Sequence, residues 1–398
     1  MRTKVKLKGG ISLIVLVITI IVMIILAAAI ILSLSNSGII SKANKAKTDS
    51  DTANLKEYVN TLRAEWELMT DAEQTAAGSF EAYANKKLEK SGYKGAVGAD
   101  GEVYSNLNEN AMAAIRAGIK VGDVVTGYTV TETTYTTSGE ENTAPKYTET
   151  DPTKQTVTTN TDITWKYLGV NANGELEIIA VLSEKDAIKD TADKQLKVKL
   201  SGKGGYLKGP EMLNTICEKL YSKDGVGTAR SMNIDDVNNI LGYTGPKGTY
   251  YDADNKEIET TTPLTIGEIE SKLGTTLSNR GTPDGKDIAT YYSDCYYINK
   301  TSDIKEMKNP ENVDLVYNAK NTYWLASPCV DAFFNYSRAG FDVRYVSPTN
   351  VGALYMSFSR GDSNYITYAV RPVVSLKSNI QITRDTGETE WKIELAQN

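Results

Sequence analysis

The sequence predicts an α+β protein in which an N-terminal transmembrane helix and a long helical region precede a loop-rich antiparallel β domain with short helices. Three observations lead to this fold class. Residues 11–34 are almost uninterruptedly apolar, the next region carries apolar residues at helical spacing, and beyond residue 119 apolar and polar residues alternate. We therefore expect a leader (1–10), a transmembrane helix (11–35), a helical stem (36–118) and an extracellular β-rich domain (119–398).

Composition argues against several classes of function. The 398 residues include no histidine, which removes Ser-His-Asp and Cys-His nucleophiles and His-ligated zinc. The net charge is −6 and no long basic stripe is present, so we expect no nucleic-acid partner. Cys217, Cys295 and Cys329 form no C-x-x-C pair, and at most one disulfide can join them. We expect no enzymatic activity, no cofactor and no metal ion.

The N-terminus predicts a single-pass membrane protein. A helix over residues 11–34, at about 1.5 Å per residue, is long enough to cross a bilayer core of roughly 30 Å. Arg2, Lys4, Lys6 and Lys8 precede it, and such basic residues keep that end in the cytoplasm and the rest of the chain outside the cell. A plain membrane anchor is the simplest interpretation.

A more specific interpretation comes from residues 8–14 (Lys-Gly-Gly-Ile-Ser-Leu-Ile) and 26–29 (Leu-Ala-Ala-Ala). They resemble the N-terminus of bacterial type IV pilins and pseudopilins. The resemblance implies cleavage after Gly10 by a prepilin peptidase, a mature N-terminus at Ile11 that becomes methylated, and packing with other pilin-like subunits. Pilins usually carry Glu at the fifth mature position, where it is thought to pair with the neighbouring subunit. This chain has Val15 there, which leaves entry into a filament open.

Beyond the membrane segment, the stem is expected to be helical. The residues at spacings of four and three, which form one helical face, are Leu55, Val59, Leu62, Trp66 and Met69. A second helix is predicted over residues 79–90, ending at Gly92.

The β-rich domain opens with a threonine-rich stretch over residues 126–164. It has two interpretations: a glycosylated or disordered stalk, or a β-hairpin with flanks at 129–131 and 156–159 and a tip at 138–153. We favour the hairpin because threonine is a strand former. A second hairpin is predicted from residues 165–170 and 176–182.

Short helices follow in the β-rich domain. Pro210 opens one, and Cys217 shares a face of it with Leu213, which favours a core role for this thiol over a nucleophilic one. Other helices are expected over residues 233–241 and from a capping box at 265–268. Residues 252–256 begin like a calcium loop, but Lys256 occupies its fifth position and favours a plain turn.

Four segments carry a second resemblance: Trp-Lys-Tyr-Leu-Gly (165–169), Ala-Arg-Ser-Met-Asn (229–233), Tyr-Trp-Leu-Ala-Ser (323–327) and Val-Arg-Pro-Val-Val-Ser-Leu (370–376). They resemble a family of uncharacterised bacterial surface domains that often follow pilin-like N-termini. More distantly, the closing strand is similar to C-type lectin-like domains, although the sugar-binding calcium motifs of lectins are absent. We expect Arg371 to be a buried, paired side chain that closes the sheet.

Residues 331–368 are rich in aromatic residues and arginine mixed with small polar residues, a composition typical of binding surfaces. An alternative is that about half of these rings belong to the core. The predicted ligand-binding residues are Phe333, Phe334, Tyr336, Arg338, Arg344, Tyr355, Phe358, Arg360 and Tyr365. The expected function is adhesion to an extracellular protein or glycan. The alternative is a minor pseudopilin with a structural role in a type IV pilus, secretion or DNA-uptake machine.

Overall fold

The computed structural model describes residues 39–140, 150–161, 163–182, 197–277, 282–317, 322–359 and 365–395. The predicted leader, the transmembrane helix and the cleavage site at Gly10 and Ile11 lie outside these residues. No helix in the described part of the chain combines the length and apolar character that a bilayer crossing requires. The chain divides into two units, of which the first comprises residues up to 95 together with 103–106. This boundary falls earlier than the predicted one after residue 118.

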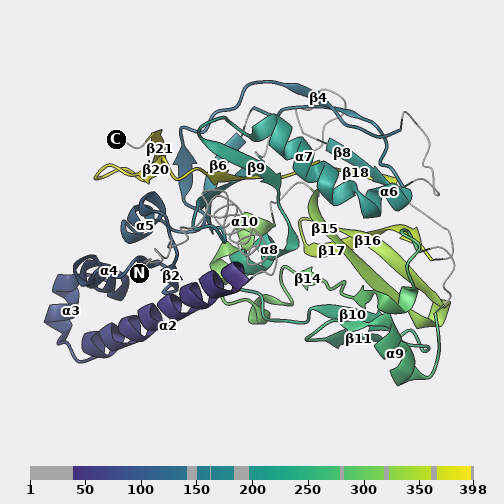
Figure 1. Ribbon diagram of the computed structural model, residues 1–398, viewed down its shortest axis with the longest axis horizontal. Coiled ribbons are helices and arrows are strands. Elements are labelled where there is room, and N and C mark those ends of the chain that lie inside the picture. Colours follow the sequence, from purple (N-terminus) through teal and green to yellow (C-terminus); the bar gives the residue numbers. More distant parts are fainter. Residues whose placement is uncertain are drawn as a thin grey trace, which may run out of the picture. The chain divides into compact units, whose positions relative to one another are not determined.

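The first unit is mainly helical. Its helices are α2 (Ile39–Glu67), α3 (Asp71–Ala77) and α4 (Phe80–Ser91), and the short strands β1 (Gly95–Val97) and β2 (Val103–Ser105) follow (Figure 1). The predicted helical face is confirmed for Leu55, Val59 and Leu62, which are buried. Trp66 and Met69 are partly buried, and Met69 lies beyond the end of α2.

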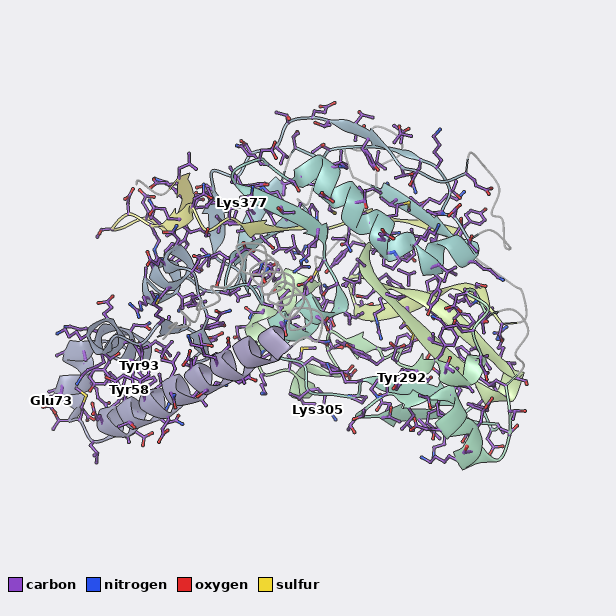
Figure 2. All side chains as sticks on the ribbon, viewed as in Figure 1. Tyr58, Glu73, Tyr93, Tyr292, Lys305 and Lys377 are labelled. Carbon is purple, nitrogen blue, oxygen red and sulfur yellow. A yellow bond between two sulfur atoms is a disulfide. The ribbon has the colours of Figure 1, made fainter. Side chains whose placement is uncertain are left out.

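Local signals set the ends of α4 as predicted. Ser79 accepts a hydrogen bond from the backbone N–H of Ala82, and Gly92 ends the helix with φ of 80°, a left-handed conformation that glycine adopts without steric cost. The ring of Tyr93 then stacks on Tyr58 of α2 at 4.9 Å between centroids (Figure 2). The stem therefore has its own packed interior.

Within the described residues, the second unit contains a seven-stranded and an eight-stranded sheet, both mainly antiparallel. This confirms the α+β class. The seven-stranded sheet comprises β3 (Val124–Thr126), β6 (Ile163–Val170), β7 (Leu176–Leu182), β9 (Gly227–Ser231), β19 (Pro372–Leu376), β20 (Ile380–Thr383) and β21 (Trp391–Leu395). Its order is β20-β21-β3-β6-β7-β19-β9, so the predicted hairpin β6–β7 forms its centre.

The eight-stranded sheet comprises β8 (Lys197–Ser201), β10 (Gly248–Tyr251), β11 (Glu257–Thr260), β14 (Ile298–Asn299), β15 (Tyr323–Phe333), β16 (Arg338–Val346), β17 (Asn350–Phe358) and β18 (Tyr365–Val370). Its main path is β11-β10-β15-β16-β17-β14, and β18 joins β15 to β8. Strand β15 pairs in parallel with β18 at its beginning and with β10 at its end. The sheet is therefore mixed rather than purely antiparallel.

Two small strand pairs complete the β structure: β4 (Thr134–Thr136) with β5 (Thr156–Thr158), and β12 (Leu264–Thr265) with β13 (Tyr292–Ser293). The threonine-rich segment thus contains the expected hairpin, but its first strand is not at 129–131. Tyr128 is buried against Trp165 and donates a hydrogen bond to the carbonyl of Tyr221. These contacts hold the chain just before residues 129–131 away from the hairpin.

The helices of the second unit are α5 (Glu109–Arg116), α6 (Gly202–Leu207), α7 (Gly209–Tyr221), α8 (Ile234–Leu241), α9 (Ile266–Leu273) and α10 (Val313–Val316). Four 3-10 turns are described: η2 (Ile288–Thr290), η3 (Ile304–Glu306), η4 (Pro310–Asn312) and η5 (Phe334–Tyr336). The predicted capping box at Thr265 is present, and the predicted helix over 233–241 also begins with a capping box, at Asn233. Helix α7 packs on β9, β15 and β19 (Figure 1), and the core role predicted for Cys217 is confirmed because its side chain is fully buried.

Arg371 lies where the chain passes from β18 in one sheet to β19 in the other. Its side chain is fully buried, as predicted, but its partners are not acidic. The guanidinium donates to the carbonyl oxygens of Ala180 at 2.7 Å and Leu315 at 2.5 Å, and to the hydroxyl of Tyr323 at 3.2 Å. One side chain thereby ties β7 of the first sheet to β15 of the second.

Candidate functional site

The candidate site lies on one face of the β15–β16–β17 meander. Antiparallel pairing sets Cys329 opposite Asp342, Asp331 opposite Gly340, and Phe333 opposite Arg338. Side chains directly opposite each other point to the same face of a sheet. This face therefore combines acidic, aromatic and basic residues.

The opposite face of the same strands belongs to the apolar core. Val330, Ala332 and Phe341 pack there with residues of α9. Phe334 belongs to this core and is buried, so the expectation that it is exposed is wrong. The reason is local: β15 ends at Phe333, and η5 turns the next ring into the core.

At the end of the meander, six side chains form what we name the aromatic–arginine cluster: Tyr251, Phe333, Tyr336, Arg338, Tyr355 and Phe358. The guanidinium carbon of Arg338 lies 3.8 Å from the ring centroid of Phe358 and 5.1 Å from that of Tyr336. Tyr355 stacks on Phe358 at 4.1 Å. Phe333 stacks on Tyr251 of the neighbouring strand β10 at 5.0 Å.

The cluster has a buried base and an exposed rim. Tyr336 is 48% exposed and Tyr355 37%, whereas Phe358 is only 5% exposed. Phe333 and Arg338 are partly buried. The predicted exposure of Phe358 is therefore wrong, because the rings of Tyr355 and Phe333 and the guanidinium of Arg338 cover it.

The remaining predicted residues do not join this cluster. Arg344 was predicted to be exposed, and this prediction is wrong. Its side chain is buried, and its guanidinium donates to the backbone carbonyls of Asp294 and Tyr296. Tyr365 is exposed, but it lies at the start of β18, whose later residue Ala369 pairs with Tyr323 at the beginning of β15. Tyr323 is itself roughly 30 Å along the strand from Phe333, so Tyr365 lies far from the cluster. Arg360 lies outside the described residues.

Below the cluster, the same face holds two buried carboxylates that the sequence analysis missed. Asp331 is 0% exposed and Asp342 4%. One carboxylate oxygen of each and the sulfur of Cys295 lie within 4.8 Å of one another. Cys295 is bonded to Cys329 in a disulfide, so its sulfur is not a thiolate. The metal-binding donors available here are therefore the two carboxylates.

Hydrogen bonding of this acidic pair is incomplete. The hydroxyl of Tyr297 donates to Oδ2 of Asp331 at 3.1 Å. Within the described residues, Oδ1 of Asp331 and Oδ1 of Asp342 are both buried without a hydrogen-bond partner. Buried polar atoms of this kind are rare in proteins and call for an explanation.

Burial disfavours charge on this pair. It raises the pKa of Asp331 to about 7 against the hydrogen bond from Tyr297 and the positive charge of Arg344. Burial also raises the pKa of Asp342 well above its usual range, and the charge of Asp331 adds to that effect. Asp294 has a raised pKa for the same main reason. Among the described residues, the carboxylates of Asp294, Asp331 and Asp342 thus share the positive charge of Arg344. When all four groups are ionised, two negative charges are uncompensated.

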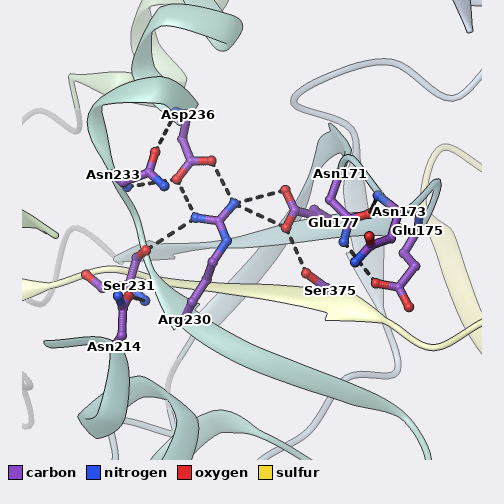
Figure 3. Close-up of polar contacts among 10 residues, drawn as sticks. All are labelled: Asn171, Asn173, Glu175, Glu177, Asn214, Arg230, Ser231, Asn233, Asp236 and Ser375. Carbon is purple, nitrogen blue, oxygen red and sulfur yellow. Dashed lines mark hydrogen bonds and ion pairs between the residues drawn. The ribbon is translucent and has the colours of Figure 1, made fainter. Parts of the chain in front are cut away.

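A second charged cluster, around Arg230, is fully paired (Figure 3). Its guanidinium donates to both oxygens of Glu177 and to both oxygens of Asp236 at 2.6–3.1 Å. Ser375 donates to Glu177, and the backbone N–H of Asn233 donates to Asp236. These contacts join β7, β9, β19 and the start of α8, so this cluster has a structural role.

A signal for the acidic pair was present in the sequence. Asp331 and Asp342 stand among apolar residues in segments that form strands, Cys-Val-Asp-Ala-Phe and Gly-Phe-Asp-Val-Arg. A carboxylate within an apolar strand segment indicates a buried charged group. That the two meet depends on the register of β15 and β16, which the sequence does not reveal.

Comparison of the chain with protein-family models, with curated proteins and with solved structures finds no match.

Proposed function

We propose that this chain is a pilin-like, membrane-anchored protein of the bacterial cell surface whose second unit binds an extracellular protein or glycan through the aromatic–arginine cluster. One observation carries the proposal: two exposed tyrosine rings surround the buried ring of Phe358 together with Arg338. Tyr336 lies under the guanidinium of Arg338, and Tyr355 stacks on Phe358, which that guanidinium also contacts. Within the described residues, Arg338 lies against aromatic rings and forms no ion pair, and its Nε is buried without a hydrogen-bond partner. Its donors are thus not consumed by an acidic neighbour there.

The physical chemistry of the cluster suits recognition. Flat aromatic side chains give a large contact area and lose little conformational entropy on binding. The stacking of Tyr355 on Phe358 and of Phe333 on Tyr251 fixes the rings before a ligand arrives. Such preorganisation lowers the entropic cost of association. A lectin-like fold of the second unit is part of this proposal.

The stem favours the pilin-like part of the proposal and also its alternative, a minor pseudopilin. Helix α2 begins at Ile39, close after the predicted transmembrane segment, and runs to Glu67. A long helix following the membrane segment is what a pilin-like chain requires. A structural subunit, however, needs no exposed aromatic cluster. A measurement of ligand binding therefore distinguishes adhesion from the role of a minor pseudopilin.

The binding test compares matched tyrosine variants of the full-length, detergent-extracted protein. Tyr336→Ser combined with Tyr355→Ser removes the exposed rim and spares buried Phe358. Tyr292→Ser is the control, because Tyr292 is also an exposed tyrosine of the second unit. On glycan arrays and host-cell surfaces we expect the double variant to lose about tenfold or more in affinity, and the control to keep its affinity. Equal binding by both variants would contradict a role of the cluster.

The membrane part has a separate test. Mass spectrometry of the membrane-extracted protein should find Ile11 at the N-terminus, with a methyl group. An intact N-terminus in cells that process other prepilins would leave a plain membrane anchor and would not affect the binding proposal.

A further inference from the structure

The buried acidic pair of β15 and β16 is poorly explained as a structural element. A structural carboxylate inside a protein normally has its oxygens bound by donors, as Glu177 and Asp236 have. The carboxylate of Asp342, in contrast, accepts no hydrogen bond from any described residue, although it is almost fully buried. A missing positive partner would account for both the burial and the unused oxygens.

Gly340 and the rings of Phe333 and Phe358 border the space beside Asp342. A Cβ atom at Gly340 would lie 2.9 Å from Oδ1 of Asp342, closer than real Cβ contacts allow. Gly340 also lies opposite Asp331 across the strand pair. A side chain at this position would therefore crowd the oxygen that lacks a partner.

We propose that Asp331 and Asp342 bind a Ca²⁺ ion. Carboxylate oxygens are the ligands that Ca²⁺ prefers, at 2.3–2.6 Å, so two oxygens on one ion are at most about 5 Å apart. The oxygens of this pair lie within 4.8 Å of each other. The divalent charge matches the two negative charges that Arg344 leaves uncompensated. Soft metals are disfavoured because the nearby sulfur is held in a disulfide.

The environment also indicates the strength of binding. Tyr297 donates to Oδ2 of Asp331 and so orients that carboxylate, leaving Oδ1 for the ion. Two carboxylates are few ligands for a Ca²⁺ ion, which lowers the affinity. The positive charge of Arg344 repels the ion and lowers the affinity further. We expect a Kd of about 0.1–1 mM, the range of extracellular calcium modules.

The inference does not depend on the proposed adhesive function and is tested on the full-length protein without any adhesion ligand. In EDTA-treated protein at pH 7.5, about 10 mM CaCl₂ should raise the melting temperature by about 3–5 °C. Terbium, used as a luminescent Ca²⁺ substitute, should bind and be displaced by Ca²⁺. Absence of both effects in the unaltered protein would overturn the proposal and leave a shared proton as the explanation of the pair.

Variants locate the ion. Asp342→Asn keeps the size of the side chain and should abolish both the thermal shift and terbium binding. The control is Asp254→Asn, in the turn at residues 252–256 that begins like a calcium loop; it should keep both. Loss of the Ca²⁺ effects in Asp254→Asn with retention in Asp342→Asn would place the ion in that turn, against the proposal. An equal thermal shift with MgCl₂ would also overturn the assignment to Ca²⁺.

Discussion

The second unit contains two charged clusters that solve the problem of burial in opposite ways. Around Arg230, one guanidinium serves two carboxylates, and both acids accept further hydrogen bonds from a hydroxyl or a backbone N–H. Around Asp342, the guanidinium that the described part of the chain supplies, that of Arg344, donates to backbone carbonyls and to neither acid of the pair. The number of charges differs little between the clusters. The difference is that the guanidinium of Arg230 donates to carboxylates, whereas that of Arg344 donates to backbone carbonyls.

This contrast shows why a buried charge has to be judged by its partners. A paired carboxylate in the interior can be ionised without a large penalty, whereas an unpaired one requires a proton or a cation. The first cluster is therefore a fastening between strands and a helix. In the second, the side chains of the described residues leave carboxylate oxygens without a partner.

The largest effect is expected from breaking the first cluster. Arg230→Ala leaves Glu177 and Asp236 buried without their counter-charge, which should cost about 3–5 kcal/mol of unfolding free energy. Urea unfolding measures this cost. Lys300→Ala, which removes an ion pair to the highly exposed Asp314, is the control and should change stability by less than about 1 kcal/mol. Similar costs for the two variants would show that the pairing around Arg230 contributes little.

Removing the disulfide beside the second cluster should have the next largest effect. Cys295 and Cys329 are 34 residues apart, and a loop of this length predicts a stabilisation of about 3–4 kcal/mol from the restricted unfolded chain. Cys329→Ala combined with Cys295→Ala should lower the urea midpoint accordingly. If the double variant is as stable as the unaltered protein, the covering segment at 294–297 is held by its hydrogen bonds alone.

The pH dependence of stability tests the acidic pair without removing a residue that holds the fold together. The raised pKa of Asp331, about 7, means that the folded state holds a proton that the unfolded state releases near pH 4. Stability from this group is full below about pH 4 and is lost as the pH rises through about 7. In EDTA we expect the melting temperature to fall by a few degrees between pH 5 and pH 8. Asp342→Asn should flatten this fall, and a fall of unchanged size would contradict the coupling of the two acids.

The smallest effect is expected from an uncharged change near Arg230. Cys217 is a fully buried free thiol, and burial raises its pKa far above the usual range, so it remains protonated. Cys217→Ala should cost about 1 kcal/mol through lost packing and leave ligand binding intact. Loss of binding without loss of stability would instead point to a chemical role for the thiol.

The parts that could be predicted from the sequence depend on neighbours along the chain. The caps at Ser79, Asn233 and Thr265 and the hairpin of β6 and β7 were predictable because each is specified within a few residues. The burial of Arg371 was also predictable, from its place beside Pro372 in a strand of β-branched residues.

The parts that could not be predicted depend on distant segments. An alternating pattern in β16 and β17 implies one exposed face. The segment at 294–297 covers that face at Arg344 of β16, and the rings of the cluster cover Phe358 of β17. The acidic pair exists only through the register of two strands. Three residues predicted to lie on the surface, Phe334, Arg344 and Phe358, are therefore buried. The prediction was correct for Tyr336 and Tyr355, which are exposed.

The place of β19 has a consequence for how this protein folds. Strand β19 lies between β7 and β9, yet its neighbour Arg371 bonds to Ala180, 191 residues earlier in the chain. During synthesis, β7 and β9 therefore emerge long before the strand that joins them. Closure of such a sheet requires contacts between distant parts of the chain, which slows folding. The seven-stranded sheet can therefore close only after nearly all of the second unit has emerged from the ribosome.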